Sequence, residues 1–444
     1  MTSWQAPPTA PGTGTGTGTC PITSDAEMDA AGSVSSTGAA PASVAASEVP
    51  PAPTADWVDP YELTVDPYPA YQRLRRESPV AWVPAVNKYL VTGYAECHAV
   101  ELDQHTYTAQ VRGTGATMIR ALGENPMLRK DDPEHATERQ AVNPSLRPKI
   151  IKQAWTPHFE RNARTYLDAL ADAGPDAAEL NRDYAAPVAS QNLIDLLGLP
   201  GIEPDQMRRW SHAFIAGTGN LLDDPSIWAA ADAARTEVDE LLDELIPFYQ
   251  AHPNESMTSA LAGSGLPRKA VAANIKLTIT GGMNEPQHMV TNMIWALDRH
   301  PDQLHRVLGE PALWPVVFDE SARWLSPIGM YPRETTRPVT LGGVALPAGA
   351  PIGVVVGSAN RDDTHFDGDP AEFDIFRSKQ PHLAFGSGVH LCAGSWAAKT
   401  AIGQIAVPLL YERFPTLHVD ERRETAWDGW VFRGLTDLPV TWEH

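Results

Sequence analysis

Residues 385–394 read Phe385-Gly386-Ser387-Gly388-Val389-His390-Leu391-Cys392-Ala393-Gly394 and deliver a single cysteine at the end of a glycine-rich loop. Because glycine lacks a Cβ, Gly386 and Gly388 allow backbone conformations that other residues resist, so the loop can lie close to a flat ligand. An apolar stripe at helical spacing follows, made of Ala398, Ile402, Ile405 and Leu409. The stripe predicts a helix that begins almost at Cys392, and a helix N-terminus favours a deprotonated sulfur. The segment therefore predicts a thiolate ligand for haem iron; the alternative is a buried, inert cysteine in a glycine-rich turn.

The spacing FGxGxHxCxG resembles the cysteine motif of the cytochrome P-450 superfamily, and the likeness covers residues 56–444. Upstream, Glu320 and Arg323 match the family's ExxR pair, with both side chains on one helical face. Such a pair alone is typical of a solvated surface contact, so its position relative to the cysteine carries the assignment. Arg377 stands where the family has a third arginine. The resemblance implies a structural network of Glu320, Arg323 and Arg377.

Haem carries two propionates, which need cationic or hydrogen-bonding partners wherever protein buries them. His135 and Arg139 lie four residues apart and resemble the family's HxxxR helix, and Arg333 and His390 stand at further family positions. The resemblance implies haem b as cofactor, with Cys392 as the axial ligand of the iron. The implied haem-binding set is Cys392, His135, Arg139, Arg333, His390, Phe385 and Gly386.

Periodicity predicts a mainly α fold, a helix-rich body with a small β portion, as in cytochrome P-450. A helix opens near residues 66–75, with proline in its first turn. Alternating or apolar runs between turn residues predict strands at 80–83, 89–92, 339–341, 344–346 and 352–356. No composition boundary follows residue 56, so residues 56–444 are expected to form one catalytic domain.

Residues 1–55 are rich in Ala, Pro, Ser, Thr and Gly, a composition that predicts a disordered low-complexity tail. The chain has neither a signal-peptide pattern nor an apolar stretch of membrane-spanning length, and three cysteines suit a reducing compartment. Its formal charge of -21 argues against nucleic acid and anionic membranes as partners. A cytoplasmic, bacterial-type enzyme is expected.

The segment Thr280-Gly281-Gly282-Met283-Asn284-Glu285-Pro286-Gln287-His288 departs from the family pattern of an acid followed by an alcohol, because Pro286 replaces the alcohol. Proline in a helix removes a hydrogen bond, so the segment is either a helix end or a kink in a continuous helix. The apolar stripe beyond Pro286 favours the kink. Proton delivery would then depend on Glu285, Asn284 or water, with Glu285 tied to an arginine as the alternative. These three residues, Asn284, Glu285 and Pro286, are the predicted catalytic set.

The pattern Met-x-Glu-Pro-x-His at residues 283–288 resembles the bacterial guaiacol and alkylguaiacol O-demethylases. The likeness extends to residues 357–360, 381–386, 429–434 and 440–443. It implies removal of a methyl group from a lignin-derived methoxyphenol, giving a catechol and formaldehyde. Gly282 above the iron, Ile328 and Phe432 are the predicted substrate-pocket residues.

No flavin, nicotinamide or iron-sulfur motif occurs, so electrons are expected from a separate protein. The resembling demethylases use an NAD(P)H-driven reductase with an iron-sulfur cluster and a flavin. Lys379, His382 and Lys399 predict a basic docking face over Cys392. The alternatives are hydroxylation of another small apolar or terpenoid substrate, a peroxide-using peroxygenase, and a haem-binding sensor or carrier without turnover.

Overall fold

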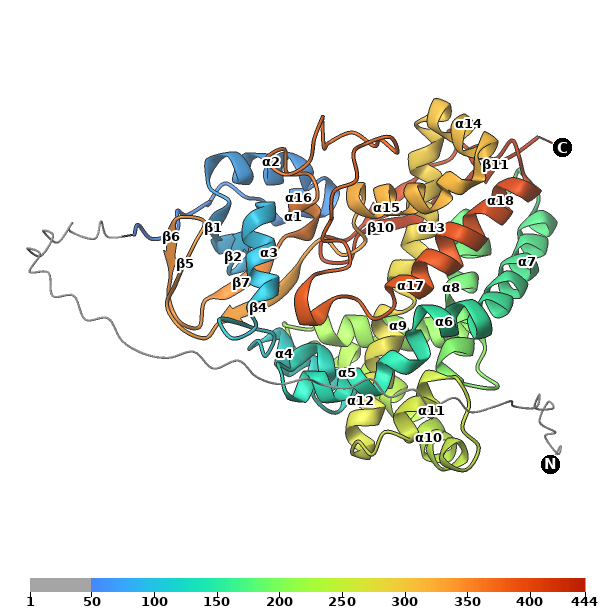
Figure 1. Cartoon of the computed structure of the whole chain (residues 1–444), viewed down its shortest axis with the longest axis horizontal. Coiled ribbons are helices and arrows are strands. Elements are labelled where there is room, and N and C mark those ends of the chain that lie inside the picture. Colours follow the sequence, from blue (N-terminus) through green and yellow to red (C-terminus); the bar gives the residue numbers. More distant parts are fainter. Residues whose placement is uncertain (1–48, 444) are drawn as a thin grey trace, which may run out of the picture. The chain divides into compact units, whose positions relative to one another are not determined.

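Helices fill most of the described chain, residues 49–443 of this computed structural model (Figure 1). The first half contains α1 (Pro60–Val65), α2 (Tyr68–Glu77), α3 (Tyr94–Leu102), α4 (Thr114–Leu122), α5 (Glu134–Leu146), α6 (Pro148–Ile150), α7 (Thr156–Ala173), α8 (Ala186–Leu197) and α9 (Pro204–Gly219). The second half contains α10 (Pro225–Ala251), α11 (Met257–Ala262), α12 (Arg268–Gly281), α13 (Asn284–Asp298), α14 (Pro301–Gly309), α15 (Trp314–Trp324), α16 (Val356–Ala359), α17 (Ser395–Ala398) and α18 (Val407–Arg413). Single turns of 3₁₀-helix lie at Pro84–Val86, Met127–Arg129, Pro311–Leu313 and Gly388–His390, and π-helical segments lie at Ile151–Trp155, Asn181–Ala185 and Lys399–Ala406.

The β portion is small, as the sequence predicts. Its strands are β1 (Val80–Val83), β2 (Lys88–Val91), β3 (Tyr107–Thr108), β4 (Tyr331–Thr335), β5 (Val339–Leu341), β6 (Val344–Leu346), β7 (Pro351–Val354), β8 (His418–Val419), β9 (Ala426–Asp428), β10 (Gly434–Asp437) and β11 (Val440–Thr441). The largest sheet has the order β1-β2-β7-β4-β3, and β2 and β7 are parallel. It therefore joins the N-terminal strands to strands some 250 residues later in the chain, blue beside orange in Figure 1. The expected strand 352–356 ends at Val354 because the short helix α16 starts at Val356.

Most of the expected tail, residues 1–55, lies outside the described residues. The part that is described already pairs with the domain: Pro51 bridges Ala345, and the Ala55 N–H donates to the Trp82 carbonyl at 2.8 Å. Ala55 is also buried. The folded chain thus starts ahead of the boundary drawn at residue 56.

The principal core lies among the helices. Its buried side chains include Phe159 of α7, Leu193 of α8, Ile279 of α12, Met293 of α13 and Phe318 of α15. The segment that follows Cys392 packs beside α13, red beside yellow in Figure 1. This packing places the cysteine loop and the α12–α13 junction on opposite sides of one region.

The expectation of one kinked helix through Pro286 is wrong in its position. Helix α12 ends at Gly281 and α13 begins at Asn284, so the break lies before the proline. Pro286 lies in the first turn of α13. The N–H groups of a first turn have no intrahelical acceptor, so the N–H that proline lacks removes no helical hydrogen bond. The proline follows a helix interruption that the two glycines make.

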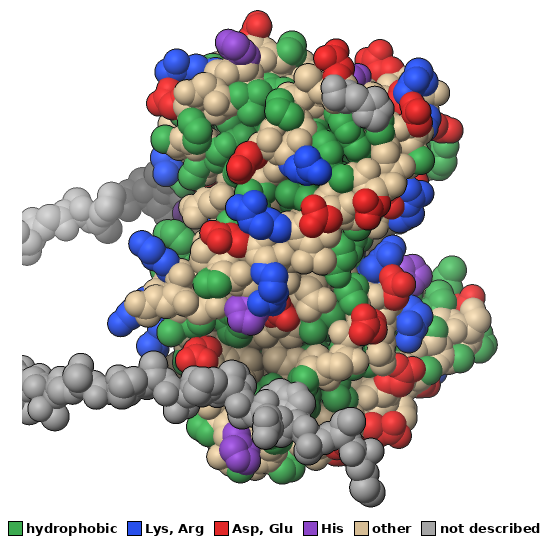
Figure 2. All heavy atoms as spheres, turned by 90° about the vertical axis from the view of Figure 1, so that its right-hand side faces the viewer, with side chains coloured by type: hydrophobic (Ala, Val, Ile, Leu, Met, Phe, Trp, Pro, Cys, Tyr) green, Lys and Arg blue, Asp and Glu red, His purple; other side chains and the backbone are tan. Residues whose placement is uncertain are grey.

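Among residues 49–443, no helix combines the length and apolar character needed to cross a membrane. Figure 2 shows one face of the molecule, on which acidic and basic side chains alternate between apolar ones. On this face both signs are interspersed, although the whole chain has 55 acidic and 34 basic residues.

Candidate functional site

The cysteine loop is held by its own backbone. The Cys392 N–H donates to the Phe385 carbonyl, and the Gly386 N–H donates to the Leu383 carbonyl, both at 2.8 Å. Gly386 and Gly388 have φ of 69° and 62°, the left-handed region that glycine tolerates. A Cβ at Gly388 would lie 2.4 Å from the backbone oxygen of Glu101 in α3. The close approach that requires glycine at 388 is therefore an approach to α3.

The Cys392 side chain keeps exposed surface, although the surrounding protein desolvates its sulfur. Burial raises the pKa of the Cys392 thiol, and hydrogen bonds from the Gly394 and Ser395 N–H groups oppose that rise. The following helix begins at Ser395, three residues later than the sequence suggests, so these two N–H groups take the part assigned to the helix end. Their donors aim at the position where a thiolate charge would sit.

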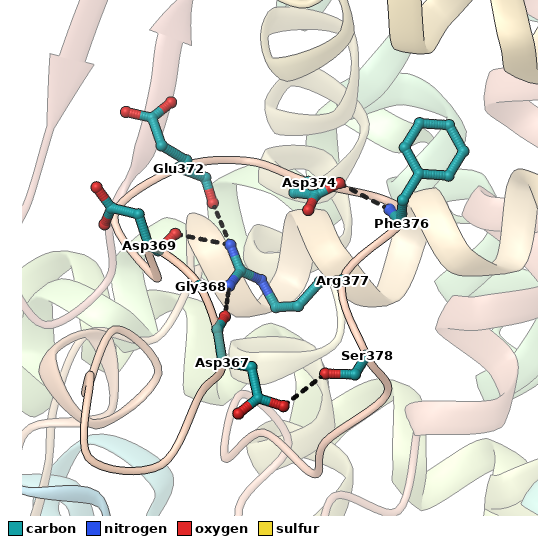
Figure 3. Close-up of a pocket in the computed structure, with 8 residues that line it drawn as sticks. All are labelled: Asp367, Gly368, Asp369, Glu372, Asp374, Phe376, Arg377 and Ser378. Carbon is teal, nitrogen blue, oxygen red and sulfur yellow. Dashed lines mark hydrogen bonds between the residues drawn. The ribbon is translucent and has the colours of Figure 1, made fainter.

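Beneath the loop, Glu320 and Arg323 form a buried two-point ion pair, with Arg323 Nε and a terminal nitrogen at 2.7 and 2.6 Å from the carboxylate oxygens. Arg323 also donates to the backbone carbonyls of Asn360, Pro370 and Glu372. Arg377 Nε lies 3.5 Å from Glu320 Oε1. Figure 3 shows its guanidinium pointing into the 367–378 loop, where it donates to the carbonyls of Asp367, Asp369 and Glu372. The structure brings together all three residues of the expected network.

A cluster of cations lies to one side of the cysteine. The rings of His135 and His390 are 4.3 Å apart, and His135 is 3.1 Å from Asp132 Oδ1. Arg139 donates to the Leu391 carbonyl, next to the cysteine, and Arg333 pairs with Glu101 at 3.1 Å. Burial, together with the charges of Arg333, His135 and Arg139, lowers the pKa of His390 to about 3. The four residues predicted to contact the propionates therefore converge.

This cluster carries more positive than negative charge. Arg129, Arg139 and Arg333 all act electrostatically on His390, and of these only Arg333 has a carboxylate partner, Glu101, among the described residues. The His390 Nε2 is buried without a partner. Uncompensated cations are costly inside a protein, so the cluster fits a group that brings about two negative charges. The two propionates of haem meet that requirement.

The opposite wall is formed at the α12–α13 junction. Burial raises the pKa of Glu285 to about 8, and an ionised Glu285 would raise the pKa of Cys392. Glu285 Oε2 is buried and unpaired, and no arginine holds this carboxyl among the described residues. The carboxyl is therefore protonated at neutral pH. Asn284 accepts only a 3.5 Å contact from Gln287.

Adjacent glycines at the junction face different ways. A Cβ on Gly282 would lie 2.6 Å from the Thr278 carbonyl oxygen and 2.8 Å from Leu193 of α8, whereas a Cβ on the exposed Gly281 would lie 3.8 Å from Glu285 Oε1. Gly282 thus permits close packing on α8, and its predicted place in the substrate pocket stays a prediction.

Two segments distant in sequence meet beside α13. Ile328 and Phe432 form an antiparallel bridge, supported by the Gly329 N–H donating to the Val431 carbonyl at 2.9 Å. His288 of α13 packs on the C-terminal strand so closely that a Cβ on Gly434 would lie 2.1 Å from its ring. The structure therefore joins the segment 283–288 to the loop that carries Phe432.

Comparison with known proteins identifies the family. The cytochrome P450 family model matches residues 312–424, which include the ExxR pair and the cysteine loop. The monooxygenase PikC of Streptomyces venezuelae is 32% identical over 86% of this chain and 92% of its own length. The chain belongs to the cytochrome P450 family. It is a haem-thiolate monooxygenase that binds haem b through a cysteine thiolate.

Two further relatives have names that refer to other pathways or products. The biotin biosynthesis cytochrome P450 of Bacillus subtilis is 27% identical over 86% of this chain and 98% of its own length. The pentalenic acid synthase of Streptomyces avermitilis is 29% identical over 85% of this chain and 94% of its own length. Among solved structures, P450BioI in complex with an acyl carrier protein ligated to hexadec-9Z-enoic acid has a TM-score of 0.78. It is 26% identical, over 87% of this chain and 100% of that one. The expected P450 fold is confirmed.

Proposed function

We propose that this P450 O-demethylates a small methoxyphenol of the guaiacol or 4-alkylguaiacol type. In the overall reaction, the methoxyphenol, O2, two electrons and two protons become a catechol, formaldehyde and water. Thiolate-held haem supplies the oxygen-activating chemistry of the family. The protein's residues bind and orient the ring, limit water and hold a proton.

The observation that carries the proposal is the contact between the two segments that resemble the demethylases. His288 lies against Gly434, and the backbone of Phe432 bridges Ile328, so the two segments that resemble the demethylases meet in the fold. Ile328 and Phe432 each retain exposed surface inside this part of the protein. A mostly apolar wall with few polar anchors suits a small aromatic ring.

Glu285 is the proposed proton donor. Its carboxyl is protonated below about pH 8 because burial disfavours the charge, and Oε2 has no partner that would compete for the proton. Pro286 offers neither a hydroxyl nor an N–H, so Asn284 is the only neighbour in the predicted set that can share a hydrogen bond. A neutral Glu285 also suits a neutral phenol, because it adds no charge that the substrate must offset.

A separate reductase with an iron-sulfur cluster and flavin, driven by NAD(P)H, is the proposed electron source. The docking face needs one correction. Burial lowers the pKa of His382 to about 4, so it is uncharged near neutral pH and adds no positive charge there. Lys399 already pairs with Asp319 at 2.8 Å, which reduces its field. His382 and Lys399 therefore contribute less positive charge to the predicted docking face than the sequence suggests, and the prediction now depends mainly on Lys379.

A titration of the ferric protein tests the substrate. Guaiacol and 4-alkylguaiacols should shift the haem spectrum from low to high spin, and turnover with a reductase should release formaldehyde and catechol in equal amounts. Matched 4-alkylphenols, which lack only the methoxy group, serve as the control. A shift that is equal with the control, or turnover without formaldehyde, would refute the demethylase assignment and leave the P450 assignment intact.

Hydroxylation of another small apolar substrate is the second candidate. It is favoured by the relatives themselves, since one is named a pentalenic acid synthase and another a mycinamicin IV hydroxylase/epoxidase. A spin shift with terpenoids and none with methoxyphenols would select it. Turnover with peroxide alone, at a rate equal to that with reductase, would instead select a peroxygenase.

A further inference from the structure

Arg129 is a buried arginine that the haem-binding pattern of the family did not single out. It ends the 3₁₀ turn Met127–Arg129 and is 6% exposed. Its Nε is buried without a hydrogen-bond partner, and no ion pair to its guanidinium occurs among residues 49–443. The charge that most affects it is Arg333, another cation, and burial lowers its pKa to about 9. A buried guanidinium without a neighbouring anion is costly, so this position fits an anionic ligand that is not part of the polypeptide.

The surrounding chain holds Arg129 firmly in this position. The Met127 N–H donates to Asn274 Oδ1 of α12 at 3.0 Å, and the Arg129 carbonyl accepts from Asn125 Nδ2 at 3.0 Å. Lys130 pairs with Glu138 of α5, and Glu138 accepts from Asn274 at 2.8 Å. Glu138 is therefore used by Lys130 and Asn274. Asp131 and Asp132, which are nearer in sequence, accept from Thr108 and Ala109 and from Gln104, respectively. Hydrogen bonds and an ion pair on both sides of Arg129 therefore hold its backbone in this buried position.

Packing places Arg129 beside the predicted propionate contacts. Its 3₁₀ turn packs on α5, the helix that carries His135 and Arg139, and the neighbouring Lys130 pairs with Glu138 of that helix. Arg333 is matched by Glu101, which leaves Arg129 and Arg139 as two unmatched arginines. Arginine binds carboxylates through two parallel N–H donors.

We propose that Arg129 binds a propionate of the haem, as a further cofactor-binding residue beside Arg139, Arg333, His135 and His390. It supplies the second of two positive charges that answer the two propionates. The proposal rests on the cofactor alone and is independent of the substrate.

Two measurements on the ferric holoenzyme test it, neither of which requires turnover. Transfer of haem to excess apomyoglobin should be about tenfold faster in Arg129→Gln, because a hydrogen bond between charged groups is lost. The reduction potential should also fall, since removing a nearby positive charge favours the more positive ferric state. Arg129→Lys keeps the charge and should restore the potential, while recovering haem retention only in part because the two-point contact is lost.

Arg112→Gln is the matched control, since Arg112 is largely exposed, lies in the same region of the chain and pairs with Glu334. It should leave both quantities unchanged. If Arg129→Gln retains haem and potential like the parent, the proposal is wrong. It is equally wrong if Arg129→Gln loses haem with no change in potential, because a merely structural arginine would behave in that way. Should Arg129→Gln fail to fold, an unchanged haem-transfer rate in Arg129→Lys would overturn the two-point contact.

Discussion

On the cysteine side of the site, backbone hydrogen bonds fix the loop and the Glu320, Arg323 and Arg377 network clamps the chain beneath it. On the opposite side, a helix break and two distant segments leave Glu285 Oε2 and His288 Nδ1 buried without partners. On the first side the loop backbone and the Glu320 network find their partners within the protein, although His390 Nε2 does not. The second side leaves a carboxyl oxygen and an imidazole nitrogen without a protein partner. The difference suggests that the first fixes the shared chemistry of the family and the second determines what is oxidised.

Cys392→Ser should have the largest effect on the haem spectrum and on turnover, because it removes the sulfur that the cysteine side holds in place. The reduced, carbon-monoxide-bound protein should lose the Soret position typical of thiolate ligation, and turnover should fall to background. Cys97→Ser is the control, since Cys97 is buried and its thiol donates to the Val91 carbonyl at 3.1 Å. A thiolate spectrum that persists in Cys392→Ser would remove the basis of the comparison.

Arg323→Met should be the next largest. It leaves Glu320 as an unpaired buried carboxylate and frees the carbonyls that Arg323 binds, so the free energy of unfolding should fall by about 3–5 kcal/mol. Glu77→Gln breaks the exposed pair with Arg73 and should cost under about 1 kcal/mol. Denaturant titrations of both variants measure the difference. Equal losses would show that the cysteine side is no better anchored than the surface.

Sequence alone predicted most of the cysteine side, because its residues occur at fixed spacings within short segments. The loop, the ExxR pair and the propionate set could all be read in this way. Arg129 could not, since the absence of a counter-charge around a buried group is a property of packing. The position of the helix break also escaped, because the apolar stripe continues past Pro286 and does not show that α12 ends at Gly281. The charge of His382 also could not be predicted, because burial, which lowers its pKa to about 4, is not visible in the sequence.

Gly434→Ala tests the open side directly. Its methyl group would collide with the His288 ring, at a strain of about 1–3 kcal/mol, and should displace the loop that carries Phe432. Affinity for guaiacol, measured by the spin shift, should fall about tenfold while the carbon-monoxide spectrum stays that of a thiolate. His288→Ala opens space for the added methyl, so the double variant should bind better than the sum of the single effects predicts. Strict additivity would show that His288 and Gly434 do not act together.

Glu285→Gln gives the smallest change and concerns the proton held on the open side. Because burial raises the Glu285 pKa from 4.5 to about 8, the carboxyl donates a proton below pH 8 and loses that ability above it. Formaldehyde formed per NAD(P)H should therefore decline in the parent above pH 8. In Glu285→Gln it should be lower by about fivefold at pH 7 and nearly independent of pH from 7 to 9. This is less than the hundredfold typical of an essential general acid, because water can also deliver the proton.

The same group links stability to pH with a definite sign. A carboxyl whose pKa is higher in the folded than in the unfolded protein favours folding below pH 4.5 and loses that contribution as the pH rises toward 8. The melting temperature of the parent should thus fall relative to Glu285→Gln between pH 5 and pH 8.5. Asp428→Asn, an exposed change on β9, controls for the loss of one acidic group. If the melting temperatures of the parent and of Glu285→Gln change equally with pH over this range, Glu285 is already ionised at neutral pH. The proton on the open side must then be held by another group.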